Sequence, residues 1–359
     1  MDAERILAHR LARSGLARRT AGSLAEAAAC PASDFARDAA LLALAARCED
    51  VERDAFDAAV DDGRLVMAHV MRGAIHALAP DDHAQFGRAL LARDDDELAV
   101  QLGQQVRQIV ARHHLAATDA LAEVADATKD ALRGGRALTK DELHEALRAR
   151  VRPELMPWCK GCGSHHVAPL LWRFAAVKAG SRLDAGRRHR LGRPGRTPSA
   201  AGALRRYLRW YGPGTPREFA EWAGLARPHA ERIWAQVEDE LDPVDGAWLP
   251  REDAAALASP SQAAGVRLLP AGDPYLARPN RRLLAPDEAL RKRLFRPVAS
   301  PGAVLRDGRL AGLWRVKLQG RTAAFTIEPL GRLGRAALAP EIERIAKLKG
   351  AERVALELA

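Results

Sequence analysis

The chain has 359 residues, a length typical of two or three domains, and 48% of them are hydrophobic. Since only 28% are charged, the chain has enough hydrophobic residues to form a buried core, and a wholly disordered chain is excluded. No apolar run approaches the ~20 residues of a membrane-spanning helix, and the N-terminal residues lack the continuous apolar stretch of a secretory signal. A cytoplasmic protein that does not enter membranes is therefore predicted.

The positive charge of the chain is concentrated in one segment. The formal net charge is +10, and the segment from Lys178 to Arg217 holds ten arginines and one lysine against a single acid, Asp184. A focused positive patch on an otherwise neutral body suits the binding of phosphates. The alternative is a solvated loop between helices, because many charge runs are only that.

The clearest structural pattern lies in residues 198–250. Three successive helices are predicted there, the second over Arg217–Trp222 and the third ending at Asp242-Pro243. The turn signal Asp245-Gly246 then begins a short hairpin. Helix, short helix, tight turn, helix and hairpin is the element order of a winged helix, a class of DNA-binding domain.

A second copy of this pattern is predicted in residues 118–197. Thr139 and Glu142 have the spacing of a capping box at the start of a helix. A loop and a further helix starting at Ser164 follow, and the basic stretch after Gly180 would be the wing.

A first copy is predicted in residues 1–80, and it is the hardest of the three to read. Helices are expected near Ser23–Ala29, Asp38–Arg47 and Glu52–Val60, and strands within Arg64–Leu78. Residues 81–117 are acidic and rich in glutamine, and they are predicted to be a helical linker between the first two copies.

The last region, residues 265–359, has short apolar runs separated by turn signals. Asp307-Gly308 between two alternating stretches predicts a hairpin, so a small β-domain is expected here. Pro340 is expected to open a closing helix over Glu341–Lys349, and a last strand is expected over Arg353–Leu358.

Four blocks of the sequence recur in the same order in one bacterial family. They are Val70–His76, Trp158–Val167, Asp273–Leu276 and Asp307–Arg315. The chain resembles the tandem winged-helix DNA-binding family that includes DNA glycosylases acting on interstrand crosslinks and bulky alkylated purines. The resemblance implies an α+β fold, mainly α, with three tandem winged-helix units and a small C-terminal β-barrel-like domain.

The resemblance also locates a candidate catalytic residue. The characterised glycosylases carry Gln-x-Gln or Gln-x-Asp just before a helix that corresponds here to Ala39–Leu44, where this chain has Ser33 and Asp34 instead. A carboxylate can position water and stabilise the cationic sugar that forms as an N-glycosidic bond breaks. Asp34, or else Asp38, is the predicted catalytic residue. The alternative is that Asp34 only caps the following helix.

Two groups of residues are predicted to contact DNA. Arg72 and His76 lie four positions apart, on one face of an extended segment, although a surface arginine beside a packed histidine is the alternative. The second group consists of arginines in the basic segment: Arg187, Arg188, Arg190, Arg193, Arg196, Arg205 and Arg206.

Cys159, Cys162, His165 and His166 invite a zinc interpretation, but all four fall within eight residues. Structural zinc sites usually draw a second pair of ligands from a distant segment, so this turn is predicted to be structural and to hold no metal. The sequence has no loop for a nucleotide cofactor, and no cofactor is expected. It also shows no heptad repeat, which favours a monomer.

Two functions remain open at this point. One is a DNA glycosylase that removes alkylated or crosslinked purines from double-stranded DNA by hydrolysing the N-glycosidic bond. The other is a non-catalytic DNA-binding protein, such as a transcription regulator or a lesion-binding factor. The missing glutamines favour the second function, and the length of the resemblance favours the first.

Overall fold

The computed structural model describes residues 2–193 and 195–359, and the chain passes several times between two units. Unit 1 comprises the residues up to Phe56, Arg206–Thr215 and Glu240–Ala359. Unit 2 comprises Asp57–Arg205 and Pro216–Asp239. No helix in the described part of the chain is both long and apolar enough to cross a membrane.

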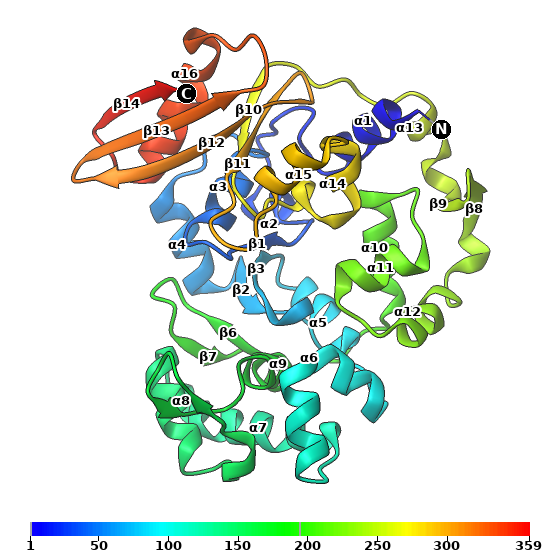
Figure 1. The fold of residues 1–359 in the computed structure, drawn as a ribbon, viewed down its shortest axis with the longest axis vertical. Coiled ribbons are helices and arrows are strands. Elements are labelled where there is room, and N and C mark those ends of the chain that lie inside the picture. Colours follow the sequence, from blue (N-terminus) through cyan, green and yellow to red (C-terminus); the bar gives the residue numbers. More distant parts are fainter. Residues whose placement is uncertain (1, 194) are drawn as a thin grey trace. The chain divides into compact units, whose positions relative to one another are not determined.

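Unit 1 begins with short helices and ends with a sheet (Figure 1). Its N-terminal elements are α1 (Ala3–Arg13), α2 (Leu24–Ala27), β1 (Ala32–Ser33), α3 (Ala39–Ala45) and the start of α4 (Arg53–Asp62). Later in the chain come β8 (Leu241–Val244), β9 (Ala247–Pro250) and α13 (Ala254–Ala258), and α14 (Arg278–Leu284) and α15 (Glu288–Leu294) lie between the first two strands of the sheet. All seven residues of α3 are buried, because its sequence is only alanine and leucine.

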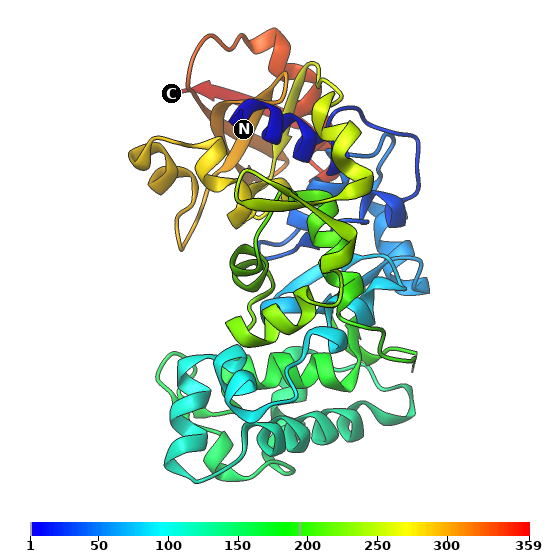
Figure 2. The ribbon, with the colours of Figure 1, turned by 90° about the vertical axis from the view of Figure 1, so that its right-hand side faces the viewer.

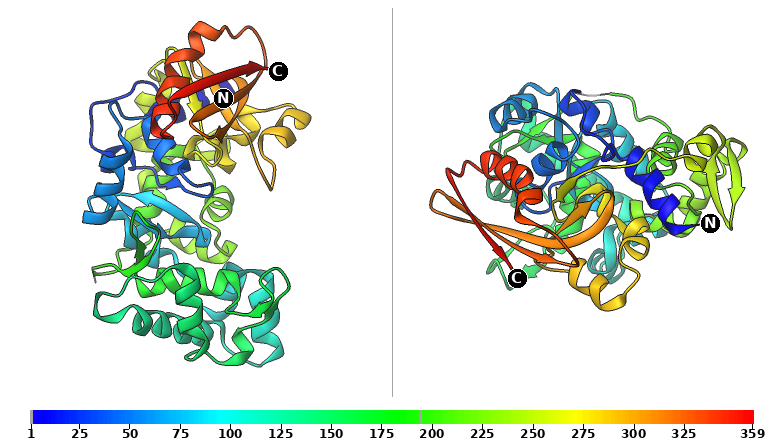
Figure 3. Two further views of the ribbon diagram at one scale, coloured as in Figure 1. Left: turned by 90° about the vertical axis from the view of Figure 1, so that its left-hand side faces the viewer. Right: turned by 90° about the horizontal axis from the view of Figure 1, so that it is seen from above.

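The short apolar runs of the C-terminal region form a five-stranded sheet within unit 1. Its strands are β10 (Val266–Leu269), β11 (Gly302–Arg306), β12 (Arg309–Gln319), β13 (Thr322–Pro329) and β14 (Arg353–Leu358), in that order across the sheet. Ala323, Phe325 and Ile327 alternate along β13 and are buried, as expected when one face of a strand meets the core. Helix α16 (Arg335–Leu348) packs against this sheet (Figure 3).

Two details of this region differ from the prediction. The sheet is open and not a closed barrel, because β14 joins β13 in parallel after α16, which leaves β10 and β14 as separate edges. Helix α16 begins at Arg335, and Pro340 lies inside it instead of opening it. A proline removes only one donor from a helix, and the buried residues Leu338 and Ile342 hold both sides of it in the core.

Unit 2 contains a helical layer and a small antiparallel sheet. Its helices are α5 (Asp82–Phe86), α6 (Asp95–Arg112), α7 (Ala117–Leu132), α8 (Lys140–Arg148), α9 (Pro169–Ala179), α11 (Pro216–Ala223) and α12 (Arg227–Trp234). Strands β2 (Val66–His69), β3 (Ile75–Leu78), β6 (Ser181–Leu183) and β7 (His189–Leu191) belong to this sheet, and β4 (Trp158–Cys159) and β5 (Ser164–His165) pair separately. Helices α6, α7 and α9 lie against one another in the lower part of Figure 2, and their buried side chains form one apolar core.

Residues 81–117, which the sequence predicted to be a linker, belong to that core. Leu98, Leu102 and Val106 on α6 are buried in the same cluster as residues of α7 and α9. Their spacing of four places them on one apolar face. The helix is kinked at Gly103, whose φ of 85° and ψ of 171° are not helical. The strands predicted within Arg64–Leu78 form the β2–β3 hairpin.

The element order predicted for residues 198–250 is also found. Helices α10 (Ala201–Tyr211), α11 and α12 are followed by the β8–β9 hairpin. The third helix ends earlier than predicted, at Trp234, and Pro243 lies in β8 opposite Trp248. A two-stranded hairpin tolerates this proline because an edge strand leaves alternate N–H groups without a ladder partner.

Candidate functional site

Asp34 lies in the turn between β1 and α3, and its side chain is buried. The residue is 4% exposed, and its Oδ1 accepts a hydrogen bond from the backbone N–H of Ala40 at 2.9 Å. Ala40 is the second residue of α3, so the carboxylate satisfies a donor at the start of that helix. The capping role considered from the sequence is therefore present, and it holds the carboxylate in one orientation.

Asp38, the other catalytic candidate, has a different environment. It occupies a left-handed backbone conformation with φ 72°, and its side chain makes no cap to α3. Its carboxylate pairs with Arg53 at 3.0 Å and lies 3.6 Å from the amine of Lys349. Two cations thus neutralise Asp38 within unit 1, which leaves Asp34 as the better candidate.

A buried ion pair anchors the far end of α3. Arg47, just after the helix, donates to Asp273 at 2.7 Å and 2.8 Å, and both residues are buried. Arg47 also donates to the carbonyls of Ala43 and Ser14, and Asp273 accepts from the backbone N–H of Tyr275. The Asp273–Leu276 block, which the sequence pointed out only through resemblance, therefore fixes the helix that Asp34 caps.

The sequence reasoning missed Phe35. This residue is 80% exposed, although its neighbour Asp34 is buried. The sequence does contain a signal for it, because Phe35 is a single aromatic residue among charged neighbours, two aspartates and an arginine. An exposed aromatic ring is suited to stacking on a base or to wedging between base steps.

The structure separates Arg72 and His76. Arg72 is exposed in the turn Met71–Gly73 between β2 and β3, with φ 59°, and it lies against Gly224 within unit 2. His76 is on β3 and is buried, and its Nδ1 donates to the Ala74 carbonyl at 3.0 Å. Burial lowers the pKa of His76 to about 4, so the ring is neutral at pH 7. Of the two residues, Arg72 is the exposed one.

The basic segment contains the antiparallel β6–β7 hairpin. Asp184 in its loop pairs with Arg190 at 3.0 Å and accepts the backbone N–H of Arg188 at 2.8 Å. Arg188 and Arg190 remain about half exposed, at 48% and 45%. The buried Asp184 therefore holds the backbone of the hairpin, while the guanidinium groups of Arg188 and Arg190 extend to the surface.

The remaining predicted DNA contacts fall outside the hairpin or at its margin. Arg193, Arg196 and Arg205 are exposed, and all three belong to unit 2. Arg206 belongs to unit 1, where it donates to the Ala29 carbonyl at 2.9 Å and stacks over Trp210. Because its guanidinium is engaged within unit 1, Arg206 is the least available of the series.

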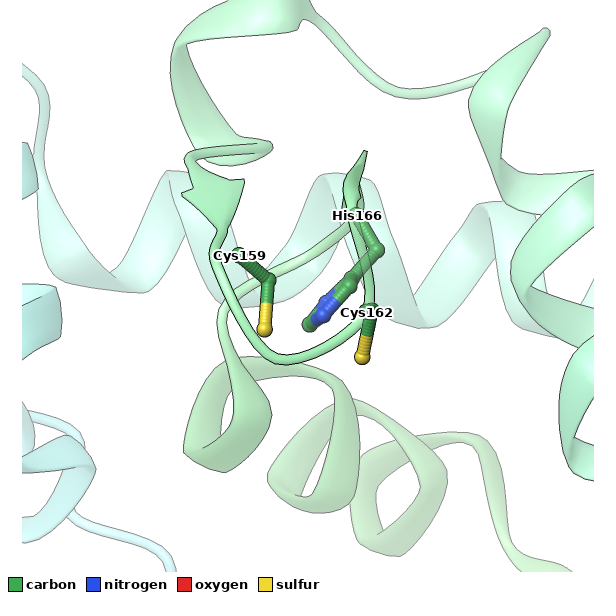
Figure 4. Close-up of side chains that lie close together, drawn as sticks. All are labelled: Cys159, Cys162 and His166. Atoms are coloured by element: carbon green, nitrogen blue, oxygen red, sulfur yellow. The ribbon is translucent and has the colours of Figure 1, made fainter.

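The turn that holds the exposed cysteines brings three possible metal ligands together. Ligand atoms of Cys159, Cys162 and His166 all lie within 4.8 Å of one another (Figure 4). The His166 side chain, followed by the backbone N–H of Cys162, lowers the pKa of the Cys159 thiol to about 7. The other two cysteines, Cys30 and Cys48, are buried in unit 1.

Known proteins resemble this chain in both sequence and fold. A protein described as an interstrand DNA cross-link repair glycosylase, from Streptomyces sahachiroi, is 26% identical over 331 residues, which cover 86% of this chain and 85% of that protein. The solved structure of Streptomyces sahachiroi DNA glycosylase AlkZ has the same fold, with a TM-score of 0.74, 23% identity and 100% of both chains covered. A family model described as DNA glycosylase AlkZ-like matches residues 31–348, and the chain therefore belongs to the AlkZ-like DNA glycosylase family.

Proposed function

We propose that this chain is a DNA repair glycosylase that binds double-stranded DNA as a monomer and hydrolyses the N-glycosidic bond of alkylated or crosslinked purines. The observation that carries the proposal is the family match over residues 31–348. The description of the Streptomyces sahachiroi relative as an interstrand cross-link repair glycosylase supports the class of lesion. An alkylated purine is already a good leaving group, so one water molecule and one positioned carboxylate are sufficient to hydrolyse the N-glycosidic bond.

DNA binding is attributed to three winged-helix modules, residues 1–80, 118–197 and 198–250. Support comes from the antiparallel hairpins β2–β3, β6–β7 and β8–β9, which follow helices in each range. The exposed arginines of the β6–β7 segment give the second module a wing that can neutralise phosphates.

Asp34 is proposed as the catalytic carboxylate. As the bond to the base breaks, the sugar acquires positive charge, and a fixed carboxylate stabilises that charge more in the transition state than in the ground state. The hydrogen bond from Ala40 holds the Asp34 carboxylate in a fixed orientation, so it need not reorganise during the reaction. Phe35, exposed beside it, is proposed to occupy the space left by a displaced base.

The test is an excision assay on duplex DNA that carries alkylated purines, with abasic sites detected by strand cleavage in alkali. Wild-type protein should produce abasic sites, and Asp34→Asn should lower the rate roughly 10²-fold or more while DNA affinity is retained. An asparagine Oδ1 can still accept the Ala40 N–H, so the helix cap survives the change. Asp38→Asn is the matched control and should excise within a few-fold of wild type.

A second candidate function is favoured by one observation. The carboxylate of Asp34 already serves α3, and the glutamines of the characterised glycosylases are absent from this position. A non-catalytic lesion-binding protein would bind alkylated duplex more tightly than undamaged duplex and leave the base attached. Absence of abasic sites on every alkylated substrate, together with such preferential binding, would replace the glycosylase proposal with this one.

A further inference from the structure

We propose that Cys159, Cys162 and His166 bind a structural Zn²⁺ ion, with His144 as the fourth ligand. The ligand atoms of the first three residues lie within 4.8 Å of one another, close enough for one ion to contact all three (Figure 4). This reverses the expectation from the sequence, where all the apparent ligands fell within eight residues. The proposal concerns unit 2 alone and does not depend on glycosylase activity.

The backbone of the turn places both thiols on one side. Strands β4 and β5 pair Cys159 with Ser164, and the backbone N–H of Cys162 donates to the Cys159 carbonyl at 3.3 Å. Gly163 follows with φ 59°, a left-handed conformation that glycine adopts without strain. A Cys-x-x-Cys-Gly turn closed in this way presents two sulfur atoms at the tip of a hairpin, which is suited to a tetrahedral ion.

The imidazole of His166 is held in the tautomer that a metal requires. Its Nδ1 lies 2.9 Å from the carbonyl oxygen of Val167, and a carbonyl can only accept, so Nδ1 carries the proton. The lone pair of the neutral ring is then on Nε2. A ligating histidine typically donates its other N–H to a backbone carbonyl in this way. The Nδ1 of His165 also lies 2.9 Å from a carbonyl oxygen, that of Met156, but His165 is not among the residues whose ligand atoms lie within 4.8 Å of one another.

His144 supplies the ligand from a distant segment that the sequence lacked. It lies on α8, and its ring centroid is 5.2 Å from that of His166. Among the described residues, its Nδ1 is one of the few buried side-chain nitrogens with no hydrogen-bond partner. A buried polar atom without a partner is costly. His144 is not among the three residues whose ligand atoms lie within 4.8 Å of one another, so its ring would turn toward the ion to complete the site. The set then comprises two thiolates and two imidazoles, which favours Zn²⁺ over Mg²⁺ or Ca²⁺.

The ion would fix one wall of a pocket. The hairpin carries Trp158, which is 56% exposed, and His165, and both line a pocket of about 670 Å³ together with Ile109 and Arg112 of α6. The hairpin is short, with two residues in each strand, so few backbone hydrogen bonds hold it. Bound zinc would tie the hairpin to α8 and so keep the pocket wall in place.

The experiment measures metal content and metal affinity in the full-length protein. Purified under reducing conditions and loaded with Zn²⁺, the wild type should retain one ion per chain after dialysis. Loaded with Co²⁺, it should show the visible absorption of a tetrahedral site with thiolate charge transfer. Cys159→Ser combined with Cys162→Ser should abolish both signals, whereas Cys48→Ser, which changes a cysteine of unit 1, should leave both unchanged.

Two further variants distinguish coordination from folding. Cys162→His keeps a ligand at that position and should retain the ion, with a cobalt spectrum that loses part of its thiolate absorption. His144→Ala should weaken Zn²⁺ affinity by more than the roughly 10- to 100-fold that loss of an outer-sphere partner costs. Unchanged affinity in His144→Ala would overturn the fourth ligand. A metal-free wild type, or a Cys159–Cys162 disulfide detected by mass after purification with reductant, would overturn the site.

Discussion

The two units bury their polar side chains in different ways. Among the described residues, the buried arginines Arg10 and Arg47 belong to unit 1, and each has several partners. Arg47 pairs with Asp273, and Arg10 donates to Asn280 and to backbone carbonyls. Unit 1 therefore buries guanidinium groups and surrounds them with hydrogen-bond acceptors. These acceptors come from residues far away in the sequence, so the fold must place them accurately.

Unit 2 instead buries neutral imidazoles and keeps its arginines at the surface. His69, His76 and His189 are buried there, and Trp172 packs edge-on against His69 and His189. Burial lowers the pKa of both His76 and His189 to about 4. Among the described residues, unit 2 thus buries no arginine, and the buried carboxylate of Asp184 pairs with Arg190, which stays about half exposed on the basic hairpin. Three predictions test this difference.

The largest expected effect is acid destabilisation of unit 2. As pH falls from about 6.5 to 4, an unfolded chain protonates its histidines while native His76 and His189 stay neutral, so stability falls through this window. Each of the two groups then costs roughly 3 kcal/mol by pH 4. Hydrogen exchange should increase for the amides of β2 and β3 before it increases for those of β11–β13.

A substitution isolates one of these groups. His76→Gln keeps a donor for the Ala74 carbonyl and cannot titrate, so its loss of urea stability between pH 7 and pH 4 should be smaller than that of wild type by roughly 3 kcal/mol. His113→Gln, at an exposed histidine, should lose as much stability as wild type. An equal loss in wild type and His76→Gln would show that His76 is not the group that titrates.

The next effect concerns the ion pair of unit 1. Asp273→Ala leaves Arg47 buried without its partner and should lower the free energy of unfolding by about 3–5 kcal/mol. Urea unfolding at pH 7 measures this loss, and Glu231→Ala, which breaks the exposed Arg227–Glu231 pair of unit 2, should cost less than about 1 kcal/mol. Replacing both partners, Arg47→Met with Asp273→Leu, should recover much of the loss. A double variant as unstable as the single one would contradict the electrostatic explanation.

Local signals in the sequence predicted the elements well. Thr139 and Glu142 form the expected capping box, with the Thr139 N–H donating to Glu142 at 2.8 Å. Asp307 and Gly308 both have positive φ in the β11–β12 turn, as the Asp-Gly signal indicates. Such features depend on residues a few positions apart, whose preferences are expressed in the sequence itself.

Long-range pairing explains what the sequence could not provide. Arg47 and Asp273 are 226 residues apart, and nothing in either local segment specifies the other. His144 approaches His166 only because α8 and α9 both pack on α7, so the metal ligands could not be collected from spacing alone. The exposure of Phe35 likewise depends on how its turn leaves the core, and not on its neighbours.

The smallest effect concerns the surface arginines of unit 2, and it is measured by DNA binding. Arg187, Arg188 and Arg190 replaced together by alanine should weaken binding to undamaged duplex DNA of any sequence. The slope of log affinity against log salt should flatten by about 0.9 for each phosphate that is no longer neutralised, hence by up to about 3. Fluorescence anisotropy at several salt concentrations measures both quantities.

The matched control removes the same charge from unit 1. Arg321, Arg332 and Arg353 are exposed on or beside the C-terminal sheet, and their replacement by alanine should leave the salt slope unchanged. Since Arg190 also neutralises the buried Asp184, the hairpin variant must first be shown to unfold at a urea concentration close to that of wild type. Equal flattening in both triple variants would mean that net charge, and not the hairpin, attracts DNA. An unchanged slope in the hairpin variant would mean that these arginines do not contact phosphates, and the difference between the units would then concern packing alone.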